Sequence, residues 1–341
     1  MEFSKINKFH QINNDIIVID GFWGSGKSLI KGIVENLQNV QSTVIHSPIE
    51  QLCIAHKFKE IRRGTASVLI KFQLEELYYK NLIGRHINLR WNDITGLKHN
   101  LHKFRTLKML FSKEGDQILE AGLENNVALS LMTHNLFSIS EPLFDSCGTN
   151  LKFVEIVRHP LFMVNHCLIY LKRFNVSRDY TLSVNHKENK VPWFMEPWLD
   201  EFSEANLTER SMMIIDKSYE ILDLTLRDFS KHQLNLLIVS FEDLTLNTFL
   251  TVNKIEKFLG RERGDKLSEY LKKSNLPRYR TFDGLVHTRY ESTNYSNMSE
   301  KDVYDFELNR LYSSTSSTQF NKFVERINWY NLNFPNKLST F

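Results

Sequence analysis

The sequence predicts an α/β fold, a three-layer core in which a central, mainly parallel sheet of about five strands lies between helices. Residues 16–19 form an apolar run that leads into a glycine-rich turn, and residues 29–37 follow with apolar side chains at helical spacing. Beyond them, short apolar runs alternate with segments of helical periodicity, as in parallel strands joined by crossover helices. The chain has 341 residues, of which 42% are hydrophobic, and this is enough to fill a large core.

The glycine-rich turn is a predicted phosphate-binding loop, or P-loop. Its pattern is Gly21-x-x-x-x-Gly26-Lys27-Ser28. This spacing lets backbone N–H groups wrap around anionic oxygens while the following helix points its positive end at them. The predicted strand and helix flank the turn in the order that the motif requires. The loop alone leaves open whether the phosphates belong to ATP, to GTP or to another nucleotide.

The other elements are expected to alternate along the chain. Further strands are predicted at 42–46, 127–134, 151–157 and 234–241, and helices at 72–78, 116–123, 136–144, 161–174, 209–229 and 319–330. Gly260 is expected to cap a helix that follows the last strand. We interpret residues 1–341 as one domain with helical insertions at about 52–125 and 175–230, and the second insertion begins with a loop-like stretch.

Polar side chains stand where the predicted strands end. His46 and Glu50 follow the second strand, which Ser47-Pro48 is expected to break into a loop. His134 ends the third strand, and Arg158 ends the fourth. Because the carboxyl ends of parallel strands meet at one edge of a sheet, these side chains are candidates for a site beside the P-loop. The plainer interpretations are solvated loop residues and, for Arg158, a structural ion pair.

Two later segments have distinctive compositions. Residues 192–198 form a dense aromatic cluster, which either packs in the core or lines a pocket for an acceptor molecule. Residues 276–284 form a basic loop in which Arg278 and Arg280 are candidates for binding an anionic nucleotide.

Charge and cysteine content argue against several classes of protein. The 43 Lys and Arg residues exceed the 40 Asp and Glu residues by only three and are scattered, so nucleic-acid binding is not expected. Three cysteines, Cys53, Cys147 and Cys167, form no close pair and indicate neither a disulfide framework nor a zinc site. No apolar signal core and no stretch of about 18 apolar residues is present. We therefore expect a soluble cytoplasmic protein without a membrane span, and a homo-oligomer stays open.

Three separated pieces of the chain carry a resemblance to a known family. They are the turn at 24–26, the segment 152–160 with its Arg-His-Pro ending, and the segment 238–260 with Phe-Glu-Asp-Leu and Phe-Leu-Gly. In order and approximate spacing they resemble the sulfotransferases that use 3′-phosphoadenosine 5′-phosphosulfate (PAPS) and share the P-loop kinase-like core. The resemblance covers roughly residues 15–260.

The resemblance implies where the donor binds. Gly24, Ser25, Gly26, Lys27 and Ser28 would hold the 5′-phosphosulfate, and Arg158 would bind the 3′-phosphate. The sequence departs from the family at the P-loop, where Gly24 replaces a usual Lys or Arg and Lys27 replaces a usual Thr or Ser.

A third departure concerns the residue eight positions after the arginine. The family has a serine for the 3′-phosphate there, and this chain has His166, which with its neighbour Asn165 is a candidate substitute.

The resemblance also offers two candidates for the catalytic base. Thr133-His134 is similar to the Lys-Thr-His of the branch that acts on small molecules, and Glu50 stands where the carbohydrate-acting branch has a catalytic glutamate. We favour His134 over Glu50, with Lys27 stabilising charge on the leaving phosphate. The implied reaction moves a sulfuryl group to a hydroxyl or amine of a small-molecule or carbohydrate acceptor and requires no metal.

Two other functions stay open at this point. An ATP- and magnesium-dependent P-loop kinase would use Lys27 on the phosphates and Ser28 on the metal, with Asp243 as the nearest acidic partner. The setting of Asp243 fits a helix-capping role better. A non-catalytic nucleotide-binding protein is the third interpretation.

Overall fold

The computed structural model describes residues 13–85, 87–90, 115–174, 180–229, 235–281 and 297–340, with the single positions 97, 107, 109, 111 and 295. Part of the first predicted insertion, at about 52–125, therefore lies outside the described residues, namely most of 91–114.

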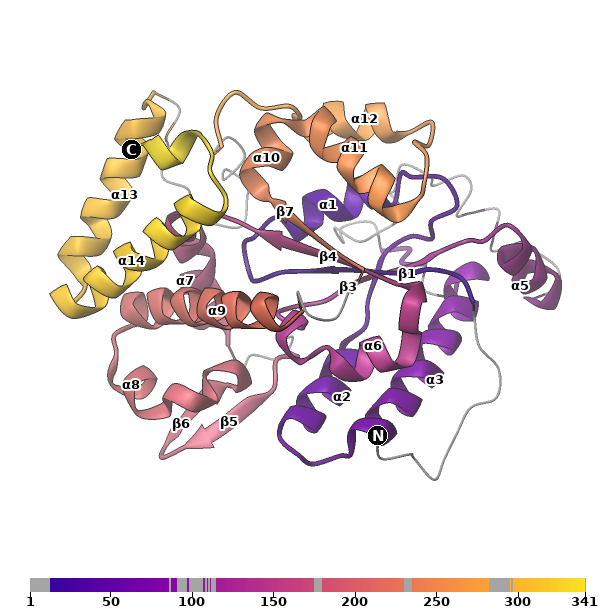
Figure 1. Ribbon diagram of the computed structural model, residues 1–341, viewed down its shortest axis with the longest axis horizontal. Coiled ribbons are helices and arrows are strands. Elements are labelled where there is room, and N and C mark those ends of the chain that lie inside the picture. The colour runs from indigo at the N-terminus through magenta and orange to yellow at the C-terminus, as the bar shows by residue number, and fades with distance from the viewer. Residues whose placement is uncertain are drawn as a thin grey trace.

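The core is a five-stranded sheet in which every pairing is parallel, as predicted (Figure 1). Its strands are β1 (Ile16–Asp20), β2 (Val44–Ile45), β3 (Leu129–Met132), β4 (Leu151–Val157) and β7 (Leu236–Ser240), in the spatial order β2-β3-β1-β4-β7. Since β1 lies at the centre of this order, the P-loop that follows it emerges in the middle of the carboxyl edge.

Helices cover both faces of this sheet. The α-helices of the described residues are α1 (Lys27–Val34), α2 (Ser47–Lys57), α3 (Arg63–Leu82), α5 (Gly115–Glu124), α6 (Glu141–Cys147), α7 (Val164–Arg173), α8 (Leu199–Glu204), α9 (Leu207–Phe229), α10 (Phe241–Leu246), α11 (Thr248–Leu259), α12 (Leu267–Lys273), α13 (Glu300–Ser314) and α14 (Ser317–Asn333). In Figure 1, α1, α10, α11 and α12 lie above the sheet, and α2, α3, α6 and α9 lie below it.

The alternation of side chains along the strands divides the core between the two faces. In β1, Ile16 and Val18 join the cluster beneath the sheet, which includes side chains of α2, α3 and α9. Ile17 and Ile19 join the other cluster, with side chains of α1, α11 and α12. The three-layer α/β class predicted from the sequence is confirmed.

Two local predictions are wrong. Ser47–Glu50 is not a loop but the first turn of α2, because Pro48 has a fixed φ that suits the start of a helix, where its missing N–H costs nothing. The insertion at about 175–230 is only partly helical, since it contains an antiparallel hairpin of β5 (Ser183–His186) and β6 (Asn189–Pro192). Lys187 adopts φ 54° in the turn, a conformation that lysine rarely takes, so the residue gives no signal of a turn.

Gly260 caps α11 with φ 64°, as expected. Among the described residues, no helix is both long enough and apolar enough to cross a membrane.

Helix α14 is tied to the end of β7 by a buried hydrogen bond. The Tyr330 hydroxyl donates to Glu242 Oε2 at 2.6 Å, and Glu242 Oε1 accepts from the backbone N–H of His159 at 3.0 Å. Tyr330 and Glu242 are both buried. The carboxylate thus joins the chain after β4, the start of α10 and α14.

We predict that Tyr330→Phe lowers the free energy of unfolding by about 1–3 kcal/mol, because Glu242 loses a donor that water cannot replace in the core. Urea denaturation measures the change. Tyr312→Phe is the matched control, since Tyr312 is 62% exposed and its hydroxyl is not in the core. Equal stability of the two variants would contradict the role of this bond.

Candidate functional site

Glycines give the P-loop a backbone path that other residues resist. Gly21, Gly24 and Gly26 have φ values of 147°, 83° and 109°. A Cβ on Gly21 would lie 2.5 Å from the carbonyl oxygen of Ile156, and one on Gly26 would lie 2.4 Å from the ring of Phe241. Gly26 is the N-cap of α1, so the loop leads directly to the positive end of that helix. The geometry is that of an anion-binding turn.

The side chains of the loop differ in their surroundings. Ser28 is exposed, whereas Ser25 is buried and its Oγ has no hydrogen-bond partner in the structure. Lys27 is 7% exposed, and its Nζ donates to the carbonyl oxygens of Gly21 at 2.5 Å and Phe22 at 3.0 Å. Burial lowers the pKa of Lys27, while the nearby Asp20 and Glu155 oppose that change. Lys27 is therefore directed at the loop itself and would have to exchange these bonds to contact an anion.

Asp20, the last residue of β1, fixes the segment that carries His134. Its fully buried carboxylate accepts from the backbone N–H groups of Leu136 at 2.6 Å and Phe137 at 2.8 Å, and from the hydroxyl of Thr133 at 3.0 Å. Burial raises the pKa of Asp20, and Lys27 opposes the rise. Asp20 is a site residue that the sequence predictions missed, although an acid that ends a buried strand just before a P-loop was a usable signal.

The two candidate bases lie together. His134 Nδ1 is 3.1 Å from Glu50 Oε1, and both side chains are partly buried. If Nδ1 carries the proton, it donates to the carboxylate and leaves Nε2 free to accept a proton. The negative charge of Glu50 also favours a higher pKa for Lys27, so the His134–Glu50 pair lies near the P-loop. His46 is engaged elsewhere, since its Nε2 lies 2.8 Å from Gln73 Oε1.

Arg158 contacts the P-loop directly. It is 4% exposed, and its Nη1 donates to the carbonyl oxygen of Gly24 at 2.9 Å. Its guanidinium lies 4.1 Å from the ring centroid of Phe241, and that of Arg278 lies 5.8 Å from the same centroid. Burial lowers the pKa of Arg158 to about 10, with Glu242 opposing and Arg278 adding to the effect, so the group stays cationic at pH 7. Two guanidinium groups thus lie near the Phe241 ring, and that of Arg158 also contacts Gly24.

His166 and Arg280 occupy different places. A Cβ on Gly24 would lie 2.7 Å from the Cβ of His166, so the histidine packs against the loop. Burial and, secondarily, Arg158 lower the pKa of His166 to about 4, which keeps it neutral at pH 7. Arg280 Nη1 donates to the carbonyl oxygen of Met298 at 3.0 Å, which ties this side chain to the segment before α13.

The aromatic cluster predicted at 192–198 packs against the P-loop. Trp193 and Phe194 are buried, and the Phe194 ring centroid lies 5.7 Å from that of Phe22 and 5.3 Å from that of Trp23. Trp23 also stacks on Tyr170 with centroids 3.3 Å apart. Of the two interpretations of this cluster, core packing describes Trp193 and Phe194, and it attaches the insertion to the P-loop.

Asp243, the candidate magnesium partner, lies in the first turn of α10. Its backbone N–H donates to the Ser240 hydroxyl at 3.1 Å, and its Oδ1 accepts from Asn247 at 3.2 Å. Among the residues that the structure describes, no group of three or more His, Cys, Asp or Glu side chains is arranged to hold a metal.

We predict that Gly26→Ala weakens binding of adenosine 3′,5′-bisphosphate (PAP) at least tenfold, because the new Cβ meets the Phe241 ring. Isothermal titration calorimetry measures the affinity. Gly260→Ala is the matched control: its φ is also positive, but nothing lies within 4 Å of the place that a Cβ would take. It should lose stability, by about 1 kcal/mol or more, without losing affinity. Unchanged PAP binding by Gly26→Ala would contradict the assignment of this turn.

Comparisons with known proteins agree with the resemblance seen in the sequence. The family model described as "Sulfotransferase domain" matches residues 130–324, which is more than half of the chain and excludes the P-loop. No curated protein matches the sequence.

Solved structures that a structural comparison matches to this chain include three sulfotransferases. The sulfotransferase domain from the curacin biosynthetic pathway is 14% identical, with a TM-score of 0.40, and the match covers 75% of this chain and 77% of that chain. The domain from the Synechococcus PCC 7002 olefin synthase is 13% identical, with a TM-score of 0.39 and coverages of 96% and 98%. Mouse sulfotransferase SULT7A1, complexed with PAP, is 12% identical, with a TM-score of 0.38 and coverages of 95% and 86%. On the extent of the family-model match, the chain belongs to the sulfotransferase domain family.

Proposed function

We propose that this protein transfers the sulfuryl group of PAPS to a hydroxyl or amine of a small-molecule or carbohydrate acceptor. The observation that carries the proposal is the contact between Arg158 Nη1 and the carbonyl oxygen of Gly24, because it places a second anion-binding group against the P-loop. A donor with phosphate groups at both its 5′ and 3′ positions needs two such adjacent groups.

The residues at the P-loop fit such a donor. The backbone of residues 24–28 and the positive end of α1 would hold the 5′-phosphosulfate. The buried Ser25 Oγ, which lacks a partner, is available as a further donor. Arg158 and Arg278 would bind the 3′-phosphate, and His166, neutral at pH 7, would add a neutral hydrogen-bonding group beside them. When bound, PAPS supplies the sulfuryl group.

The His134–Glu50 pair would act on the acceptor. Nε2 of His134 takes the proton of the acceptor hydroxyl while the acceptor oxygen forms its bond to sulfur and the bond from sulfur to the phosphate oxygen breaks. Glu50 holds the imidazole in the required tautomer and stabilises the imidazolium that forms. Lys27, released from the loop carbonyl oxygens, would stabilise the charge on the departing phosphate. The scheme uses no metal.

One observation keeps the kinase as a second candidate, namely the sequence Lys27-Ser28 at the start of α1. Titration with PAP in the absence of metal and, separately, with ATP and magnesium distinguishes the two. Micromolar binding of PAP, about −8 kcal/mol, supports the sulfotransferase, whereas binding of magnesium-ATP alone would overturn it.

We predict that Arg158→Ala weakens PAP binding about 10- to 100-fold but leaves binding of ADP, which has no 3′-phosphate, nearly unchanged, because a hydrogen-bonded charge pair is lost only with PAP. Calorimetry measures both ligands. Arg261→Ala is the matched control, since Arg261 is also buried but binds Asp15, just before β1 at the opposite end of that strand. A similar loss for both ligands would show that Arg158 acts only on the structure of the loop.

We predict that His134→Ala lowers turnover about 10²- to 10⁴-fold without weakening PAP binding, because the general base is removed and the donor site is kept. Glu50→Gln should cause a smaller loss, since its amide oxygen can still accept from Nδ1. Transfer from radiolabelled PAPS to a pool of phenols, amines and oligosaccharides measures turnover. His186→Ala is the control, because His186 pairs with Asp200 near the β5–β6 hairpin. Wild-type turnover in His134→Ala would exclude His134 as the base.

A further inference from the structure

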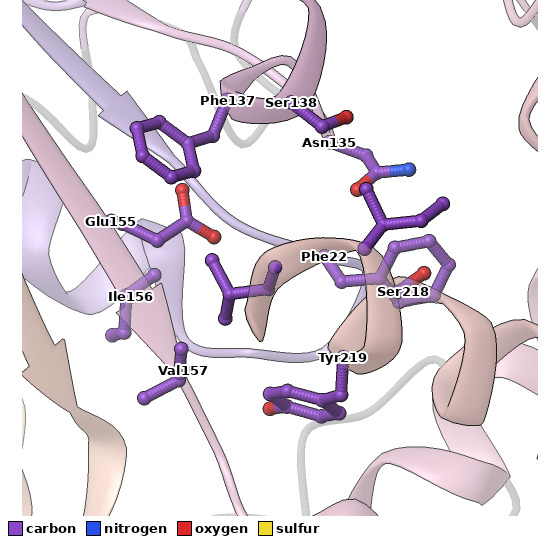
Figure 2. A pocket seen from close by; sticks show the side chains of 11 residues that line it. Phe22, Asn135, Phe137, Ser138, Glu155, Ile156, Val157, Ser218 and Tyr219 are labelled. Atoms are coloured by element: carbon purple, nitrogen blue, oxygen red, sulfur yellow. The ribbon is translucent and has the colours of Figure 1, made fainter. Parts of the chain in front are cut away.

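A narrow pocket lies beneath the site, between the end of β4, α9 and the segment that follows β3 (Figure 2). Its cavity volume is about 20 Å³. This is room for one water molecule or one group of similar size. Most of its walls are apolar, and they include the rings of Phe22, Phe137 and Tyr219. The polar lining consists of Asn135, Ser138, Glu155 and Ser218. The Tyr219 hydroxyl is bonded to the backbone of Arg158.

Glu155 lies at the inner end of this pocket. The residue is 7% exposed, and its Oε2 has no hydrogen-bond partner in the structure. Figure 2 shows its carboxylate directed into the space between the lining side chains. Asn135, Ser138 and Ser218 are only half-buried, so they form the outer part of the pocket. A buried carboxylate oxygen without a partner is costly, and a ligand that supplies a donor would remove that cost.

Glu155 shares the positive charge of Lys27 with a second buried acid, Asp20. Asp20 pairs with Glu155 in the register of β1 and β4, and it already accepts three hydrogen bonds. Lys27 donates to two carbonyl oxygens of the P-loop, and its charge acts on both acids. Burial, followed by Asp20, raises the pKa of Glu155, and Lys27 opposes the rise. One lysine thus serves two adjacent buried acids.

We propose that this pocket binds the ammonium group of an amine-bearing acceptor, with Glu155 as its counter-ion. A primary ammonium group has the size of the cavity and carries three donors for Glu155 and the surrounding oxygens. The aromatic rings in the walls also favour a cation over a neutral group. The inference rests on the proposed function and specifies the class of its acceptor.

The position of the pocket suits this role. Asn135 directly follows His134, and Phe22 belongs to the P-loop, so the outer part of the pocket adjoins both the base and the donor loop. An acceptor held at its ammonium group would extend outward past Asn135 and Ser138. The ammonium group therefore serves as an anchor for the acceptor, and the hydroxyl that is sulfated lies elsewhere in the same molecule.

The test is a calorimetric titration of the PAP-bound protein with phenethylamine and with 2-phenylethanol, which has the same size but no charge. We expect the amine to bind at least tenfold more tightly than the alcohol. Glu155→Gln should reduce the affinity for the amine to that for the alcohol and leave PAP binding unchanged. Glu188→Gln, at an exposed position in the hairpin turn, is the matched control and should change neither affinity.

Ser218→Leu provides a second variant in case Glu155→Gln does not fold. It fills the outer part of the pocket from α9 without removing a buried charge, and it should abolish amine binding. Equal affinities for the amine and the alcohol, or undiminished amine binding by Glu155→Gln or Ser218→Leu, would overturn the proposal and leave the pocket as a site for water only. Failure of PAP to bind would instead contradict the proposed donor, so the two failures are distinguishable.

Discussion

The buried carboxylate of Asp20 is the constraint on which the rest of the site depends. An ionised carboxylate inside a protein needs several donors, and Asp20 obtains them from Thr133, Leu136 and Phe137, on both sides of His134. Because Asp20 is also the residue before Gly21, one side chain sets the position of His134 relative to the P-loop. The positive charge of Lys27, which lies near this carboxylate, opposes the rise in the pKa of Asp20.

The other side of the P-loop is held by residues from distant parts of the chain. The Tyr219 hydroxyl, from α9, accepts from the backbone N–H of Arg158 at 2.9 Å, and Glu242 accepts from the next backbone N–H. Tyr330, from α14, completes this group through its bond to Glu242. The arginine that contacts Gly24 is therefore positioned by three elements that follow it in the sequence, and a local change in any of them would reach the P-loop.

The sequence predicts the parts of the fold that depend on local patterns and misses those that depend on packing. The five strands and the P-loop follow from apolar runs and glycine spacing. The sequence patterns do not predict helix α13, because the stretch of sequence around it is polar, although the capping box of Ser299 and Asp302 marks its start. The roles of Asp20 and Glu155 arise only when β1 and β4 pair and bury them side by side. In the same way, His134 and Glu50 stand as alternatives in the sequence because nothing there shows that they meet.

The contact between Gly24 and His166 has a consequence for how this chain differs from its family. The resemblance places a larger basic residue where Gly24 stands and a smaller serine where His166 stands. A Cβ on Gly24 would occupy the space of the His166 side chain. The two departures therefore compensate each other in volume, because position 24 has no side chain and position 166 has a larger one. The imidazole fills the room that a side chain at position 24 would need. A change toward the family pattern at either position alone would leave a clash or a gap, so these positions are expected to change together.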